Sequence, residues 1–116
     1  MIELLSADTP NGKKISIMLE EIGFEYSVTK ININKDEQFN PEFRKISPFS
    51  KIPVIKDGDI SIFESGAILI YLGEKSGKFY NPNERLIINQ WLMGQMAYVG
   101  PMLGQHHQFH HYNSGK

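Results

Sequence analysis

Apolar residues recur along the first part of the chain with two periods, one typical of strands and one typical of helices. Short apolar or alternating runs predict strands at residues 2–5, from 26 to about 31, at 53–55 and at 60–62. Apolar stripes with a spacing of three and four predict helices at 13–22, from 41 and at 64–75. In sequence order these elements form βαβ and then αββα, which predicts an α/β fold. Its first two strands are parallel, and its last two form a hairpin at Asp57-Gly58.

The chain changes character after residue 77. Residues 78–83 contain a proline and predict a linker, and residues 84–103 predict one long helix that Pro101 should kink or break. The apolar face of this helix is too large for a solvated tail, so it either packs on a partner chain or opens a larger helical domain. We favour the second interpretation. We therefore predict one domain at 1–77 and the start of a truncated all-helical domain at 84–116.

The charge balance and the absence of cysteine narrow the function classes. The chain has 116 residues, of which 12 are basic and 13 acidic, for a net charge of -1. This balance gives no electrostatic reason to expect nucleic acid or an anionic membrane as a partner. Zero cysteines exclude a disulfide framework and a cysteine metal site, and they fit a reducing, cytoplasmic compartment. We find no signal-peptide pattern and no apolar run of about 18 residues, so we expect no membrane-spanning helix.

Pro53 stands at the start of an apolar strand and offers no N–H to a sheet. If the peptide bond between Ile52 and Pro53 is cis, the N–H and C=O of Ile52 become free to pair with an extended ligand. The alternative is an ordinary proline on an edge strand, and cis bonds are a small minority of X-Pro bonds. The pattern alone leaves both interpretations open.

Glu64 and Ser65 open the helix that follows the hairpin. A carboxylate at a helix start can simply stabilise the helix by interacting with its dipole, and a hydroxyl there can cap the free N–H groups. The same geometry can bind a ligand that carries both charges of an α-amino acid. The helix N–H groups and Ser65 would then hold its carboxylate, and Glu64 would accept from its ammonium.

Thr9 and Asn11 follow the first strand, at the end where α/β folds bind ligands. A hydroxyl or amide donor in this position can hydrogen-bond a thiolate and lower the pKa of the thiol. A turn with Asn11 as helix cap explains the same residues without a ligand. Gln38 and Lys51 are either solvated side chains or ligand contacts, with Lys51 able to pair with a carboxylate.

Four histidines lie near the end of the sequence, at positions 106, 107, 110 and 111. In a helix they would form two pairs four residues apart, which is a metal-ligand spacing. The segment has no acidic partner and follows Gly104, so we expect no metal site.

Taken together, these motifs resemble the glutathione transferase superfamily, whose first domain has a thioredoxin-like βαβ-αββα fold. Pro53 matches the family's cis-proline, and Glu64-Ser65 matches its paired acidic residue and serine for the γ-glutamyl end of glutathione. Four stretches are similar to the bacterial Nu-class enzymes and a related yeast prion protein, namely residues 9–13, 63–69, 90–92 and 100–105.

The resemblance implies a glutathione-dependent enzyme that needs no cysteine of its own, and it favours disulfide reduction over conjugation of glutathione to electrophiles. It also implies a homodimer with glutathione as co-substrate and no metal. It assigns Thr9 and Asn11 to the glutathione sulfur, Ile52 to the cysteinyl part, Glu64 and Ser65 to the γ-glutamyl end, and Gln38 and Lys51 to the glycyl end or a second glutathione. A non-catalytic glutathione-binding or interaction domain stays open, because fold alone does not settle function.

Overall fold

The computed structural model of the chain describes residues 1–101, which fall into two compact units. The first unit comprises Met1–Phe79, and the second begins at Tyr80. The domain boundaries at residues 77 and 84, and the truncated helical domain, stay predictions.

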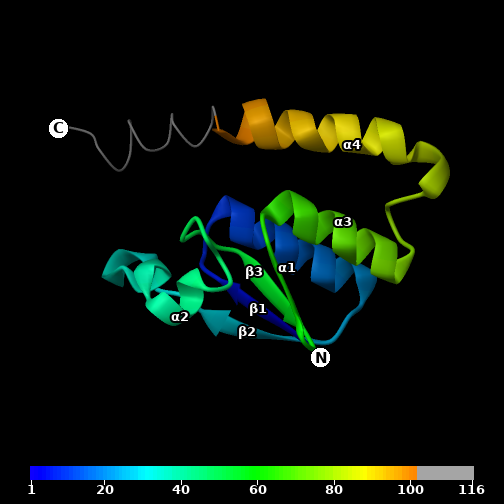
Figure 1. Ribbon diagram of the computed structural model, residues 1–116. Coiled ribbons are helices and arrows are strands. Elements are labelled where there is room, and N and C mark those ends of the chain that lie inside the picture. The colour runs from blue at the N-terminus through cyan, green and yellow to red at the C-terminus, as the bar shows by residue number, and fades with distance from the viewer. Residues whose placement is uncertain (102–116) are drawn as a thin grey trace. The chain divides into compact units, whose positions relative to one another are not determined.

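Four strands form a mixed sheet in the first unit (Figure 1). They are β1 (Ile2–Ser6), β2 (Tyr26–Lys30), β3 (Val54–Asp57) and β4 (Ile60–Phe63), in the order β2-β1-β3-β4. The β1–β2 pair is parallel, and the β1–β3 and β3–β4 pairs are antiparallel. The βαβ and αββα order expected from the apolar pattern is confirmed.

Helices α1 (Pro10–Ile22) and α3 (Ser65–Ser76) lie side by side on one face of the sheet (Figure 1). Apolar side chains at helical spacing on both helices pack on strand side chains that point to the same face. Burial of each large apolar side chain of this kind contributes roughly 1.5–3 kcal/mol. The buried members of this core are Ile2, Leu4, Ile15, Leu19, Ile22, Ile55, Ile68 and Leu72.

Helix α1 begins earlier than the sequence predicted, and the expectation that Asn11 caps it is wrong. The cap is Thr9, whose Oγ1 accepts a hydrogen bond from the N–H of Gly12 at 3.1 Å. Pro10 is the first helical residue, a position that suits proline because an N–H there has no helical partner. Asn11 therefore lies in the first turn of α1, where its side chain makes other contacts.

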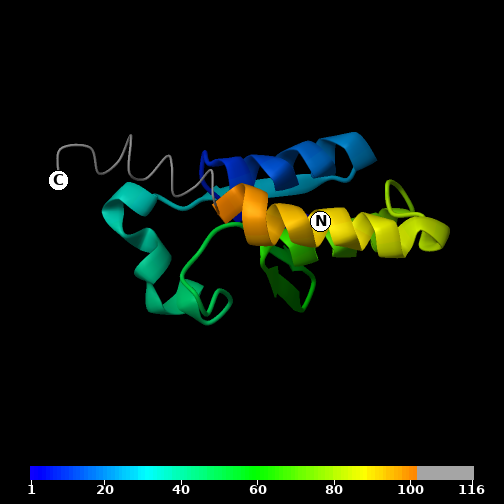
Figure 2. The ribbon, with the colours of Figure 1, turned by 90° about the horizontal axis from the view of Figure 1, so that it is seen from above.

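A second, smaller core lies between the sheet and the segment that joins β2 to β3. This segment contains two short 3-10 turns, η1 (Ile33–Lys35) and η2 (Glu37–Phe39), and the single-turn helix α2 (Pro41–Arg44). Figure 1 and Figure 2 show the segment near one end of α1. The core that anchors it consists of Leu5, Ile31, Phe43 and Val54. Phe43 of α2 thereby fixes the start of the loop that leads to β3.

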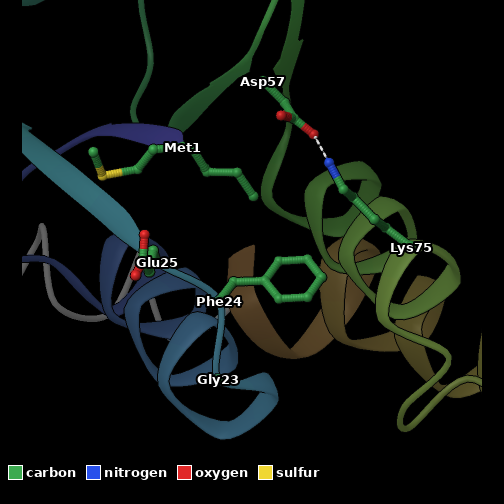
Figure 3. A pocket seen from close by; sticks show the side chains of 7 residues that line it. Met1, Gly23, Phe24, Glu25, Asp57 and Lys75 are labelled. Atoms are coloured by element: carbon green, nitrogen blue, oxygen red, sulfur yellow. Dashed lines mark hydrogen bonds and ion pairs between the residues drawn. The ribbon is translucent and has the colours of Figure 1, made fainter.

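A cluster of three polar side chains, Asp57, Tyr71 and Lys75, joins β3 to α3 on the face of the sheet that the helices cover. The Asp57 carboxylate accepts a hydrogen bond from the Tyr71 hydroxyl and forms an ion pair with the Lys75 ammonium. Figure 3 shows the Lys75 side chain pointing at Asp57. The bonds from Lys75 and then from Tyr71 lower the pKa of Asp57, whose side chain is 17% exposed. The cluster therefore stabilises the fold above the ordinary pKa of an aspartate, and this contribution is lost as the pH falls through the lowered pKa.

We expect Tyr71→Phe to lower the free energy of unfolding by about 1 kcal/mol at neutral pH, because one hydrogen bond to a carboxylate is lost. The difference from the wild type should shrink as the pH falls from the ordinary pKa of an aspartate through the lowered pKa of Asp57, because the carboxylate is then protonated. Urea unfolding at neutral and acidic pH measures both effects. Tyr26→Phe is the control, because its hydroxyl bonds the exposed Glu20 at 3.2 Å and should contribute less. A loss that stays constant with pH would contradict the role of the Asp57 charge.

The second unit contains a 3-10 turn, η3 (Pro82–Glu84), followed by α4 (Arg85–Gly94). The helix continues as a π-helical segment, Gln95–Val99, in which the Gly100 N–H bonds the Gln95 carbonyl. The kink or break expected at Pro101 stays a prediction, because Gly100 and Pro101 are again α-helical and the described residues end there. Several apolar side chains of this unit are exposed, namely Leu86, Ile87, Trp91, Met93, Tyr98 and Val99. Within residues 1–101, no helix is both long and apolar enough to cross a bilayer.

Candidate functional site

A hollow of about 260 Å³ opens in the first unit where the loop before β3 meets the starts of α1 and α3. Six of the eight predicted site residues line it, and Thr9 and Gln38 do not. The lining residues are Asn11, Ser47, Phe49, Lys51, Ile52, Pro53, Phe63, Glu64 and Ser65. Segments that are far apart in the sequence thus converge on one cavity.

Asn11 reaches the hollow from the first turn of α1. Its amide oxygen Oδ1 accepts a hydrogen bond from the Lys14 ammonium at 2.7 Å. Partial burial lowers the pKa of Lys14. The neighbouring Thr9 is half-buried, and its oxygen is occupied by the Gly12 N–H. Thr9 and Asn11 thus each accept a hydrogen bond from a residue of α1, and their hydroxyl and NH2 hydrogens can still donate to a ligand.

The peptide bond between Ile52 and Pro53 is cis. Pairing between β3 and β1 begins at Val54, one residue after this bond. Within the described part of the chain, neither the N–H nor the C=O of Ile52 makes a hydrogen bond. This unpaired peptide group at the wall of a hollow can form two hydrogen bonds with an extended ligand.

Ser47 holds the loop that carries Ile52 through two hydrogen bonds to Lys51, which we call the Ser47 clip. Its hydroxyl donates to the Lys51 carbonyl at 2.7 Å and accepts from the Lys51 N–H at 3.0 Å. The Ser47 residue is only 2% exposed, so these bonds are shielded from water. Ser50 lies inside the clipped turn with a positive φ of 56°, a conformation that the short loop imposes. The clip therefore sets where the Lys51–Ile52 backbone lies.

Glu64 and Ser65 form the wall opposite the loop, at the start of α3. Glu64 has a φ of 75° and a ψ of 117°, and such a left-handed backbone costs a non-glycine residue roughly 1–3 kcal/mol. Its side chain is exposed and makes no capping bond to α3. Ser65 is 6% exposed and is the first residue of the helix. Unlike α1, this helix receives no capping bond from the side chain of the residue before it. The Glu64 carboxylate and the N–H groups at the helix start therefore suit a ligand that carries the ammonium and carboxylate of an amino acid.

The two predicted contacts for a second carboxylate are placed differently. Lys51 lines the hollow with an exposed side chain. Gln38 lies in η2 and is not among the lining residues. Its amide oxygen is buried and has no hydrogen-bond partner within residues 1–101. The structure thus brings Lys51, but not Gln38, to the cavity.

Three lining residues were missed by the sequence analysis. For Ser47 the available signal was its place beside a proline, because a serine in a tight turn often bonds backbone groups nearby. Phe49 and Phe63 pack edge-to-face with ring centroids 6.1 Å apart, and Phe49 is 67% exposed. An aromatic residue inside a polar turn was the available signal for this apolar rim.

We expect Ser47→Ala to lower the free energy of unfolding by about 1–2 kcal/mol, because a buried N–H and a buried carbonyl lose their partner. The loosened loop should also weaken glutathione binding if the hollow is the binding site. Urea unfolding and titration calorimetry measure the two effects. Ser76→Ala is the control, since it removes a similar pair of local bonds, to Gly73 and Lys78, away from the hollow. Unchanged affinity in Ser47→Ala would mean that the clip does not shape the site.

A larger, shallower hollow of about 330 Å³ lies by the Asp57–Lys75 pair, near Phe24 (Figure 3). Its charged lining side chains are those of the Asp57–Lys75 ion pair and Glu25, and none of the predicted site residues lines it. Within residues 1–101, no three histidine, aspartate or glutamate side chains are grouped closely enough to hold a metal ion. The histidines at positions 106, 107, 110 and 111 lie outside the described residues.

The class of protein follows from the fold together with this site. Residues 2–74 match the family model of the glutathione S-transferase N-terminal domain, so the chain belongs to this family. The thioredoxin-like α/β fold is confirmed. The resemblance to the Nu-class enzymes and the yeast prion protein is confirmed as well.

Individual relatives are similar over nearly the whole chain. The disulfide-bond oxidoreductase YfcG of Escherichia coli is 48% identical over 120 residues, which cover 96% of this chain and 56% of that protein. The transcriptional regulator URE2 of Saccharomyces cerevisiae is 36% identical over 118 residues, covering 92% of this chain and 33% of that protein.

A crystal structure of a glutathione transferase from Pseudomonas putida superposes with a TM-score of 0.90 at 47% identity, and the match covers 96% of this chain and 52% of that one. That structure contains one glutathione disulfide per subunit. The chain spans about half the length of the curated relatives it matches.

Proposed function

We propose that this protein binds glutathione in the hollow and uses it to reduce disulfides by thiol–disulfide exchange. The proposal rests on one observation, which is the set of groups that line the hollow. The hollow holds the unpaired peptide of Ile52, the amide of Asn11 and the start of α3, where Glu64 makes no side-chain capping bond, in a chain without cysteine. The nucleophilic sulfur must then come from the ligand.

The chemistry of the lining residues fits glutathione group by group. The γ-glutamyl end carries an ammonium and a carboxylate, which suit Glu64 and the N–H groups and hydroxyl at Ser65. The peptide of the cysteinyl part suits the unpaired Ile52 backbone, and the glycyl carboxylate suits Lys51. This order leaves the sulfur near Thr9 and Asn11, as the family resemblance implies. Gln38 keeps its proposed role at the glycyl end or at a second glutathione.

The proposed reaction balances with two molecules of glutathione. A donor at Asn11 stabilises the thiolate of the first, which attacks one sulfur of the substrate disulfide and expels the other sulfur as a thiolate. A second glutathione thiolate attacks the mixed disulfide and releases the remaining substrate thiolate, which takes up a proton. Two glutathiones are oxidised to glutathione disulfide while one substrate disulfide is reduced to two thiols. The name of the relative YfcG supports this choice over conjugation.

Two other functions compete with disulfide reduction. The same thiolate can attack an electrophile, and the apolar rim of Phe49 and Phe63 would suit an aromatic one. A non-catalytic glutathione-binding or interaction domain is supported by the similarity to URE2, which is named a transcriptional regulator.

Titration calorimetry with reduced and oxidised glutathione, followed by turnover assays, separates these functions. We expect binding of glutathione and turnover of a model disulfide. Turnover of only a chlorodinitrobenzene-type electrophile would establish conjugation, and binding without turnover would establish the non-catalytic role. No binding at millimolar ligand would overturn the proposed site.

Ser65→Ala should weaken glutathione binding about tenfold, because a hydrogen bond to a charged carboxylate is lost. Calorimetry measures the change in Kd. Ser61→Ala, on the exposed strand β4, is the control and should bind like the wild type. Equal affinities of Ser65→Ala and Ser61→Ala would place the γ-glutamyl end elsewhere.

We also propose a homodimer in the cytoplasm. The exposed apolar side chains of α4, such as Leu86 and Trp91, support an interface with further protein surface. The absence of cysteine fits a reducing compartment.

A further inference from the structure

Lys14 does not line the hollow, yet it is bonded to a residue that does. It lies one turn after Asn11 on α1, and its ammonium donates to the Asn11 Oδ1 at 2.7 Å. Lys14 is half-buried, and this partial burial lowers its pKa.

The two ends of an asparagine amide have nearly the same shape but opposite hydrogen-bonding character. An ammonium has donors and no acceptor, so Lys14 can bond only the oxygen end of Asn11. When that end is held by Lys14, the NH2 group is turned to the other side. A bond from a cation also polarises the amide, which makes its N–H groups stronger donors.

We propose that Lys14 is a positioning residue that fixes the amide of Asn11 with its NH2 group, and not its oxygen, offered to a sulfur in the hollow. This inference rests on the proposed function, because it takes the ligand to be a thiol. An amide turned the other way would place a carbonyl oxygen beside a thiolate and disfavour its charge.

The adjacent Lys13 provides a matched comparison on the same helix. Its ammonium pairs with the Asp8 carboxylate at 3.2 Å, and the side chains are 64% and 81% exposed. Lys13 carries the same charge next to Lys14 but makes no bond to Asn11. Lys13→Met therefore removes one positive charge from the start of α1 without releasing the amide.

The first test needs no glutathione. We expect Lys14→Met to shift the side-chain NH2 resonances of Asn11 in ¹⁵N spectra and to speed their exchange, because the amide can then rotate. Lys13→Met should leave these resonances in place. Lys14→Arg should restore most of the wild-type shifts, since it keeps a cationic donor. Identical Asn11 resonances in the wild type and Lys14→Met would overturn the proposal, whatever the protein does with glutathione.

The second test measures the thiol of bound glutathione. Lys14→Met should raise its pKa by about one unit, since a donor and a nearby positive charge both favour the thiolate. Thiolate absorbance against pH gives this value, and calorimetry should show a much smaller change in affinity. A thiol pKa equal in Lys14→Met and Lys13→Met would overturn the proposal while leaving the proposed function intact. A wild type that binds no glutathione would overturn both.

Discussion

Replacing Gly12 with alanine should destabilise the first unit by about 3 kcal/mol, a large part of the stability of a small domain. A Cβ at this position would lie 2.3 Å from the Ser6 Oγ and 2.4 Å from the Ala7 carbonyl oxygen. The second of these contacts is with backbone, so a change of side-chain rotamer cannot relieve it. Either α1 moves away from the end of β1, or the loop that carries Thr9 is displaced. Urea unfolding followed by circular dichroism measures the loss.

Two further variants make this result specific. Gly94→Ala, also in a helix, has no atom of residues 1–101 within 4 Å of the added Cβ and should be neutral or stabilise the helix by up to about 1 kcal/mol. Ser6→Ala combined with Gly12→Ala should remain nearly as unstable as Gly12→Ala alone, because the Ala7 oxygen still blocks the Cβ. Recovery in the double variant would show that only the hydroxyl of Ser6 requires a glycine at position 12.

Gly12 also determines where α1 begins, and this position brings Asn11 to the hollow. Its N–H is the donor that Thr9 caps, and the absence of a Cβ lets α1 approach the end of β1. We expect the Gly12→Ala variant, under conditions where it is still folded, to lose glutathione turnover through displacement of Asn11. Stability and site geometry are thus two consequences of one close contact.

Local patterns were sufficient to predict the elements of the fold. The stripe that includes Ile15 and Leu19 predicted α1, and the alternation around Asp57-Gly58 predicted the β3–β4 hairpin. Both signals arise from neighbours in sequence, because helical and strand periods repeat within a few residues. The start of α1 was misplaced because Thr9 and Asn11 are both good caps, and the choice between them depends on how Gly12 packs against Ser6 and Ala7.

The site was only partly predictable, since its parts come from distant segments. Glu64 and Ser65 carry a local signal at a helix start, and Pro53 carries one at a strand start. The serine–proline pair at Ser47 indicates a turn, but it does not show that the Ser47 hydroxyl holds Lys51 by both backbone groups. The pairing of Lys14 with Asn11 has an ordinary helical spacing and gains a meaning only when Asn11 is found at the hollow.

Asn11→Ala should lower disulfide turnover about a hundredfold, the loss typical when one donor to a developing negative charge is removed. The affinity for glutathione should change little, because the proposed contacts of its two ends involve Glu64, Ser65 and Lys51 instead. A donor that acts mainly on the thiolate lowers kcat without an equal change in Kd. Steady-state kinetics combined with calorimetry gives the two quantities separately.

Asn11→Asp is the informative companion, because it keeps a carboxyl oxygen for Lys14 but offers no N–H to the sulfur. If the amide acts as a donor, the aspartate variant should be at least as slow as the alanine variant, since a negative charge beside a thiolate raises the pKa of the thiol. If Asn11 serves only to hold Lys14 and the first turn of α1, the aspartate should be nearly as active as the wild type. Equal losses of turnover and affinity in Asn11→Ala would show instead that Asn11 positions the ligand as a whole, and the sulfur would then need a different donor, with the Thr9 hydroxyl the nearest in sequence.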